Sequence, residues 1–106
     1  MAVFEVVAWD VKPGRREEFL SLARDLKGIC QRVDVGLTSI RMLESTIGGP
    51  NSGRISMVFE HADLAAWGSS VTKEQQDAEF QALSKQSDTD PSATLVSRTI
   101  LTEIEF

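Results

Sequence analysis

The sequence predicts one α+β domain, residues 1–106, in which strands and helices follow a βαββαβ order. Three observations support this fold class: a strand-like start, one strongly amphipathic stretch, and a glycine-rich segment between two further strand-like stretches. Two crossovers of the usual right hand place both predicted helices on the same face of a four-stranded antiparallel sheet. In the usual arrangement for this order, the first and third strands are central.

The first half of the chain gives the clearest elements. Residues 2–9 are rich in Val and Phe and predict a strand, which Lys12-Pro13-Gly14 ends. Residues 15–32 predict a helix because apolar side chains recur every three or four residues. These side chains are Phe19, Leu22, Leu26, Ile29, Cys30 and Val33.

Residues 37–44 and 54–60 predict the second and third strands, joined as a hairpin by the glycine-rich residues 45–53. Asp63 is a plausible N-cap for a helical segment that ends near residues 68–70. Thr72 and Gln75 have the spacing of a capping box, which predicts a second segment to about Gln86. Residues 94–106 predict a long last strand.

Composition excludes several classes. The net charge is −5, and a nucleic-acid-binding protein needs a basic stripe that this sequence lacks. No apolar run is long enough to span a membrane. Cys30 is the only cysteine, which excludes an internal disulfide or a cysteine-cluster metal site, and we interpret it as a small core residue. We expect a cytoplasmic protein without a metal or cofactor.

The sheet is expected to need a second copy of the chain. Both sides of the first strand are apolar, whereas a strand facing water alternates more cleanly. We predict a mixed helix-free face of Val3, Glu5, Val7, Trp9, Ser39, Arg41, Leu43, Ser56, Val58 and Glu60. A homodimer would bury this face around a pocket; a dimer without a pocket and a monomer are the alternatives. The last strand, whose facing the pattern leaves open, would pair with the partner chain.

At this point the chain resembles the dimeric α+β barrel superfamily, which has a ferredoxin-like fold. The segment from Glu5 through Lys12-Pro13-Gly14 to Glu17-Glu18-Phe19-Leu20 is similar to the opening of antibiotic-biosynthesis monooxygenase-like and NIPSNAP-like domains. Residues 59–67 are similar to their strand-to-helix passage, and residues 48–53 resemble NIPSNAP-like members. The resemblance implies dimerisation and a fold that hosts cofactor-independent monooxygenases, haem-degrading enzymes and isomerases.

Trp67 stands where the resemblance places a tryptophan over the pocket. Haem-degrading members also carry a histidine about one helical stretch later and an asparagine on the first strand. Here Asp77 stands near the histidine position and the first strand has no asparagine, so haem degradation is disfavoured. The chain has no tyrosine, which separates it from the monooxygenases that use one.

The candidate catalytic residues are Glu60, Arg41 and His61. His61 is the sole histidine and is either a general acid/base at the barrel mouth or a surface residue. A carboxylate would take a proton while Arg41 holds an anion, or these charges pair at the interface. The candidate ligand-binding residues are Glu5, Val7, Trp9, Val58 and Trp67, whose tryptophans either stack on a ligand or pack.

These expectations favour a homodimeric small-molecule-binding protein. It would be a cofactor-independent monooxygenase-like or isomerase-like enzyme on a hydrophobic or aromatic metabolite. The alternative is a non-catalytic ligand-binding or interaction protein that uses the same dimeric barrel.

Overall fold

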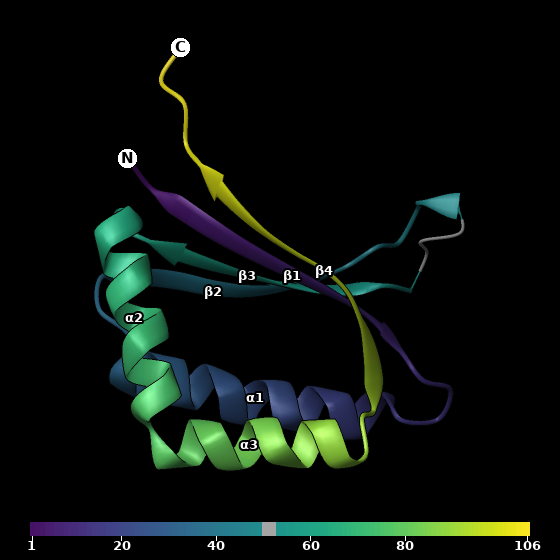
Figure 1. The fold of residues 1–106 in the computed structure, drawn as a ribbon. Coiled ribbons are helices and arrows are strands. Elements are labelled where there is room, and N and C mark those ends of the chain that lie inside the picture. Colours follow the sequence, from purple (N-terminus) through teal and green to yellow (C-terminus); the bar gives the residue numbers. More distant parts are fainter. Residues whose placement is uncertain (50–52) are drawn as a thin grey trace.

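The computed structural model describes residues 1–49 and 53–106 of the chain. It contains a four-stranded antiparallel sheet and, among the described residues, three helices packed against one face of it (Figure 1). The elements are β1 (Val3–Val11), α1 (Arg16–Val33), β2 (Leu37–Glu44), β3 (Ile55–His61), α2 (Leu64–Gln76), α3 (Ala78–Thr89) and β4 (Ala93–Thr102). This is the ferredoxin-like α+β fold that the sequence predicts.

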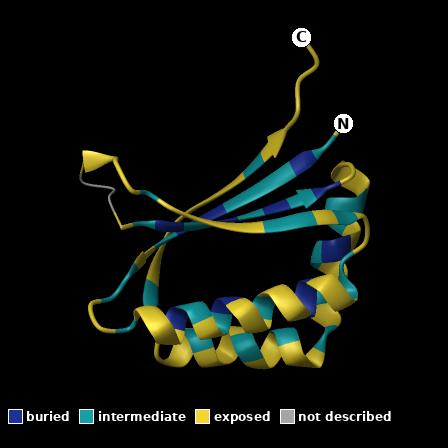
Figure 2. Cartoon of the chain, turned by 180° about the vertical axis from the view of Figure 1, so that it is seen from behind, coloured by how far each residue is buried: buried dark blue, intermediate teal, exposed yellow. Residues whose placement is uncertain are grey.

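The strand order is β2-β3-β1-β4, so β1 and β3 are central as predicted. The β2–β3 hairpin is also confirmed, although residues 50–52 of its predicted tip lie outside the described residues. Figure 2 shows buried residues along the central strands and on the side of α1 that faces the sheet, while β4 is largely exposed. The core joins Val7, Met57 and Phe59 of the sheet to Ala23 and Cys30 of α1.

The predicted facing of β1 is wrong. Val7 lies in the core beneath the helices, and the Trp9 ring meets the Phe19 ring of α1 edge-on at 5.3 Å between centroids. Because side chains alternate along a strand, Val3 and Glu5 share this helix-covered face, and Phe4, Val6 and Ala8 occupy the open one. Sequence patterning could not separate the two faces because both are apolar.

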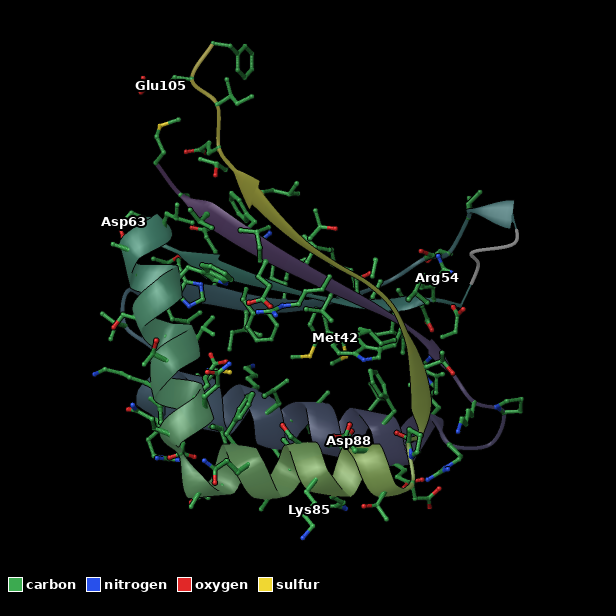
Figure 3. The ribbon with its side chains drawn as sticks, in the orientation of Figure 1. Met42, Arg54, Asp63, Lys85, Asp88 and Glu105 are labelled. Carbon is green, nitrogen blue, oxygen red and sulfur yellow. The ribbon has the colours of Figure 1, made fainter. Side chains whose placement is uncertain are left out.

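The predicted facing of β2 and β3 is confirmed. Met57 lies in the core and pairs with Met42 of β2, whose side chain extends toward the helices (Figure 3). The neighbours of Met57 and Met42 along their strands therefore face the other way. Arg41 of β2 lies opposite Val58 of β3 on the open face of the sheet. The open face thus combines Arg41, Leu43, Val58 and their neighbours with Phe4, Val6 and Ala8 rather than with Val3, Glu5, Val7 and Trp9.

The predicted break after Gly68 is also wrong, since α2 runs unbroken to Gln76. The Thr72 hydroxyl donates to the Gly68 carbonyl oxygen at 3.2 Å, so it bonds back into the helix instead of capping a new one. Asp63 is the N-cap of α2, as predicted, and Asp77 caps α3 by accepting a hydrogen bond from Phe80 N–H at 3.1 Å. The third helix therefore begins five residues later than the predicted second segment.

The end of the last helix and the end of the last strand also differ from prediction. The final helix continues to Thr89, beyond the expected Gln86, and β4 ends at Thr102 instead of Phe106. The Glu103 N–H donates to the Ala2 carbonyl oxygen at 2.9 Å, and the chain then leaves the sheet (Figure 1). Within the described residues, no helix has the length and apolar character needed to cross a membrane.

Close contacts fix α2 at the end of the sheet. Gly36 has a φ of +63°, and a Cβ there would stand 2.9 Å from the Ala66 Cβ. The buried Ser70 hydroxyl accepts a hydrogen bond from Val35 N–H at 2.8 Å. These contacts hold the helix that carries Trp67 and Glu74 close to the start of β2.

Candidate functional site

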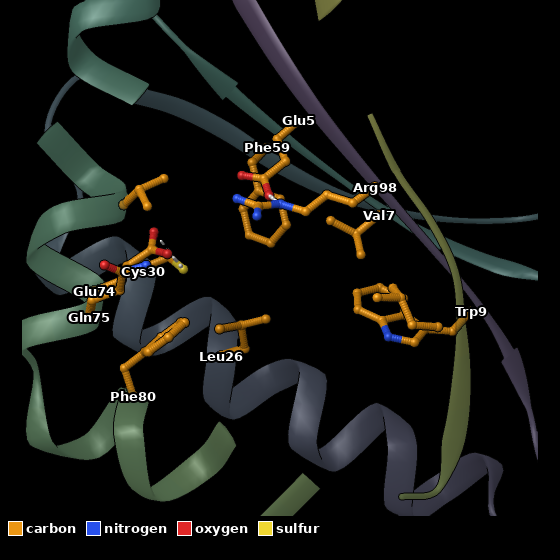
Figure 4. A pocket seen from close by; sticks show the side chains of 12 residues that line it. Glu5, Val7, Trp9, Leu26, Cys30, Phe59, Glu74, Gln75, Phe80 and Arg98 are labelled. Atoms are coloured by element: carbon orange, nitrogen blue, oxygen red, sulfur yellow. Dashed lines mark hydrogen bonds and ion pairs between the residues drawn. The ribbon is translucent and has the colours of Figure 1, made fainter. Parts of the chain in front are cut away.

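A cavity of about 290 Å³ lies between the helix-covered face of the sheet and the helices (Figure 4). It is lined by Glu5, Val7, Trp9, Leu26, Cys30, Phe59, Val71, Glu74, Gln75, Phe80, Leu95 and Arg98. Its volume is close to the lower end of the roughly 300–1,000 Å³ range of ligand pockets. A molecule of about one or two rings would match this size.

Aromatic and aliphatic side chains form most of the cavity wall. Val7 and Trp9 come from β1, Leu26 from α1, Phe59 from β3 and Phe80 from α3 (Figure 4). The strand places Val7 and Trp9 on the same side because they are two residues apart. Such a wall favours an apolar or aromatic molecule, which would gain burial and ring contacts.

Glu5 forms the centre of a polar group on the sheet side of the cavity. Its Oε1 accepts a hydrogen bond from Trp67 Nε1 at 3.0 Å, and its Oε2 accepts one from Arg98 Nε. The Arg98 guanidinium also lies 6.0 Å from the centre of the Trp67 ring, within range of a cation–π contact. Three elements thus hold a charged pair against the apolar wall.

A second polar group, on the helix side, contains Cys30, Asp34 and Glu74. One potential ligand atom from each lies within 4.8 Å of the others, and Cys30 Sγ is 3.8 Å from Glu74 Oε2. Burial, helped by hydrogen bonding with Asp34 and by the charges of Asp34 and Glu5, raises the pKa of Glu74 to about 8. Burial likewise raises the pKa of the Cys30 thiol far above its ordinary value. Near neutral pH, Glu74 is therefore a neutral acid that can donate a proton.

His61 is buried, with 1% of its surface exposed, so its interpretation as a surface histidine is wrong. Its Nε2 lies 3.1 Å from Asp34 Oδ2, at the end of β3 where the helix-covered face meets the end of α1. His61 contacts the Cys30–Asp34–Glu74 group through Asp34 and does not line the cavity. The predicted role as a general acid/base stays a prediction that no cavity contact supports.

Arg41, Val58 and Glu60 lie on the open face of the sheet, away from the cavity. Glu60 Oε2 accepts a hydrogen bond from the Thr38 hydroxyl at 2.7 Å. The prediction that Glu5 shares one face with Arg41 and Glu60 is therefore wrong, because the register sends Glu5 to the helices. Of the eight predicted site residues, Glu5, Val7 and Trp9 line the cavity and Trp67 contacts Glu5.

Sequence reasoning missed Glu74, Phe80 and Arg98. Glu74 lines the cavity because α2 runs unbroken through residue 72, and Phe80 reaches the cavity from the separate helix α3. The polar Thr72–Gln75 stretch instead resembles a helix start, and that interpretation hid the inward position of Glu74. Arg98 is on the same side of the predicted last strand as several apolar residues. This pattern was the one indication that its charged side chain would face the interior.

No family model and no curated protein matches this chain. Among solved structures, a NIPSNAP family protein from Agrobacterium tumefaciens is similar with a TM-score of 0.76 and 18% identity, over 99% of this chain and 88% of that one. The cofactor-independent oxygenase SnoaB from Streptomyces nogalater has a TM-score of 0.71 and 14% identity, over 99% and 95%. A putative antibiotic biosynthesis monooxygenase from Bordetella bronchiseptica has a TM-score of 0.67 and 14% identity, over 98% of each chain. The resemblance stated from the sequence is thus confirmed for the fold.

Proposed function

We propose that this protein binds a small hydrophobic or aromatic molecule in the cavity between the sheet and the helices. The observation that carries this proposal is the combination of an aromatic wall with two polar groups that face it. Apolar walls supply affinity, and a few fixed polar groups orient the bound molecule. Trp9, Phe59 and Phe80 would contact the ring, while Arg98 and Glu74 would meet its polar substituents.

The further proposal is an enzyme that moves a proton on this molecule, as an isomerase-like or cofactor-independent monooxygenase-like protein would. Both oxygens of Glu5 are bonded already, which leaves Glu74 as the better placed acid/base. The ionised form of Glu74, which a pKa of about 8 leaves in the minority near neutral pH, would take a proton from a substrate carbon or hydroxyl and leave a substrate anion. The anion would either regain the proton at another atom or transfer one electron to molecular oxygen. In the second case the substrate radical and superoxide would combine, take the proton back from Glu74 to form a hydroperoxide, and lose water to leave a carbonyl group. Arg98 would stabilise its charge.

Cofactor-independent oxygenase activity is a property of SnoaB, and a shared fold does not transfer a reaction. The second candidate is therefore a non-catalytic binding protein. The engagement of Glu5 by both Trp67 and Arg98 favours it, since a carboxylate held in this way gives shape and charge to a pocket without being free to react.

Binding is tested by titrating the protein with naphthol and recording tryptophan fluorescence, because Trp9 lines the cavity. Leu26→Trp would fill the cavity and should abolish saturable binding. The matched control is Leu64→Trp, at an exposed position at the start of α2, which should leave binding unchanged. Equal binding by both variants would mean that naphthol sits elsewhere, for instance on the open sheet face, and would refute the cavity proposal.

Catalysis is tested by screening metabolites that binding identifies. Glu74→Gln should abolish turnover of a bound compound while its affinity stays within a few-fold of the wild type. A compound that binds the cavity but is never converted by the wild type supports the non-catalytic alternative.

The homodimer belongs to this proposal as well. The open sheet face carries exposed Leu43 and Leu101 beside the less exposed Phe4, Val6 and Val58, and a second copy would cover these side chains. The cytoplasmic location stays a prediction from the sequence, which cell fractionation would check.

A further inference from the structure

The Cys30–Asp34–Glu74 cluster brings three potential metal ligands together from two elements. Cys30 lies near the end of α1, and Asp34, four residues later, is its C-cap with its N–H donating to the Cys30 carbonyl oxygen at 2.9 Å. Residues four apart lie on one side of a helix, so the two side chains point the same way. Glu74 approaches them from α2, and its Oε2 is 3.8 Å from Cys30 Sγ.

Asp34 supplies a second, independent observation at this cluster, because one of its carboxylate oxygens is buried without a fixed hydrogen-bond partner. Its side chain is fully buried, at 0% exposed, and Oδ2 faces His61 Nε2 at 3.1 Å. Among the described residues no fixed donor reaches the other oxygen, Oδ1, and only the Glu74 carboxyl, while it holds its proton, can donate toward Asp34. A buried carboxylate oxygen without a partner costs free energy, so such an oxygen in a folded protein calls for a bound water, proton or ion.

The charges around the cluster are unbalanced. Within residues 1–49 and 53–106, no Arg or Lys forms an ion pair with Asp34 or Glu74. Glu5 adds a further acidic group nearby, but Arg98 already pairs with it. Because Cys30, Asp34 and Glu74 have no Arg or Lys partner in the described part of the chain, they must either retain protons or bind a positive ion.

We propose that Cys30, Asp34 and Glu74 bind a divalent metal ion, and that their mixed sulfur and oxygen set selects Zn²⁺. Zinc accepts thiolate and carboxylate ligands at about 2.0–2.3 Å, in sites of three protein ligands with a fourth position for water or substrate. Magnesium and calcium prefer oxygen alone. The potential ligand atoms of the three residues lie within 4.8 Å of one another. Side-chain movements of about 1 Å would therefore bring all three to these distances from one ion.

His61 would then act as a supporting residue. With its Nε2–H donating to Asp34 Oδ2, it would hold the carboxylate so that Oδ1 faces the ion, as hydrogen-bonded outer residues do in metal sites. The cavity supplies the entry path, because Cys30 and Glu74 are part of its wall. This inference goes beyond the small-molecule proposal and does not depend on it. A bound ion would hold Glu74 ionised and would end its role as a proton donor.

The test is titration of the chelator-treated protein with Zn²⁺ by calorimetry and with Co²⁺ by absorption spectroscopy. We expect one site per chain and a thiolate-to-cobalt charge-transfer band. Cys30→Ser should remove the band, and Asp34→Asn and Glu74→Gln should each weaken zinc binding at least about tenfold. Asp88→Asn and Glu79→Gln, at exposed acidic positions on α3, are the matched controls and should bind as the wild type does.

The pH dependence gives a second readout that folding defects would not imitate. Zinc must displace the protons that Glu74 and Cys30 hold, so binding should tighten at least about tenfold from pH 6.5 to 8.5. The groups around the cluster that also enter this balance are Glu5, His61 and Arg98. No zinc binding at micromolar concentration, or binding that survives both Cys30→Ser and Glu74→Gln, would overturn the proposal. A failure of naphthol binding would leave these measurements unaffected.

Discussion

The indole nitrogen of Trp67 donates a hydrogen bond of 3.0 Å to Glu5, which connects α2 directly to the central strand β1. The Glu5 side chain is only 14% exposed, and its other oxygen is bonded to Arg98 of β4. One carboxylate therefore links a helix, the central strand and an edge strand beside the cavity. A carboxylate with so little access to water depends on both of these donors.

Trp67→Phe should destabilise the protein by about 1.5–3 kcal/mol, the range for a hydrogen bond to a charged group. A smaller aromatic ring remains, but the N–H donor is lost, and Glu5 keeps only Arg98. Urea denaturation followed by circular dichroism measures this change. The control is a double-mutant cycle: after Glu5→Gln the same Trp67 substitution should cost clearly less. Independent, additive effects of the two substitutions would contradict the contact.

Glu5 also shows why the sequence predicted the fold better than the site. Strand and helix periodicity are local, and the periods at residues 2–9 and 15–32 were sufficient for the order of the elements. The facing of β1 depends on which of two apolar sides meets the helices, Val7 and Trp9 or Phe4 and Val6. A lone acidic residue such as Glu5 predicts that its side of the strand faces water. Here Glu5 faces the helices because Trp67 and Arg98 bond to its carboxylate, and both are more than 60 residues away in sequence.

Glu74 could not be predicted for a related reason. Its position is set by Asp77, which caps α3, and by the hydroxyl of Thr72, which bonds back to Gly68. The residue types at this break fit two different helix starts, and only the packing of α2 against α1 and against Val35 and Gly36 selects one. The buried pair of Glu74 and Asp34 forms between α2 and the end of α1. Periodicity predicts each helix separately and does not show how two helices pack together.

Gly36→Ala should destabilise the protein, because φ is +63° and the new methyl would meet Ala66 at 2.9 Å. The left-handed conformation alone costs about 1–2 kcal/mol, and the contact adds to this by displacing α2. The matched control is Gly28→Ala, inside α1 with open space at the Cβ position, which should stabilise the protein by about 0.5–1 kcal/mol. Thermal denaturation of the two variants should thus give shifts of opposite sign, and equal shifts would contradict the close packing of α2.

Glu74 should make the metal-free protein less stable as pH rises. Burial raises its pKa from 4.5 to about 8, so between these values the folded state keeps a proton that the unfolded state has released. Stability is then lost across this window, by at most about 1.4 kcal/mol per pH unit, and levels off above pH 8. Urea denaturation in the presence of a chelator measures the slope. Glu74→Gln should remove this part of the slope, whereas Glu79→Gln should retain it. Parallel profiles for the wild type and Glu74→Gln would show that the carboxyl is ionised throughout.

The open face of the sheet should be the place where two copies of the chain meet. Val58 lies near its centre, paired with Val6 on one side and with Arg41 on the other. A stable interface buries about 800 Å² per partner, so one arginine at its centre would have to be desolvated without a matched partner. Val58→Arg should therefore shift the protein from dimer to monomer in light scattering at micromolar concentration, with unchanged circular dichroism.

Leu64→Arg, exposed at the start of α2, is the control and should stay dimeric. A wild type that is already monomeric at that concentration would contradict the dimer. If Val58→Arg remains dimeric, the contact lies elsewhere, and the exposed residues after β4 become the next surface to substitute.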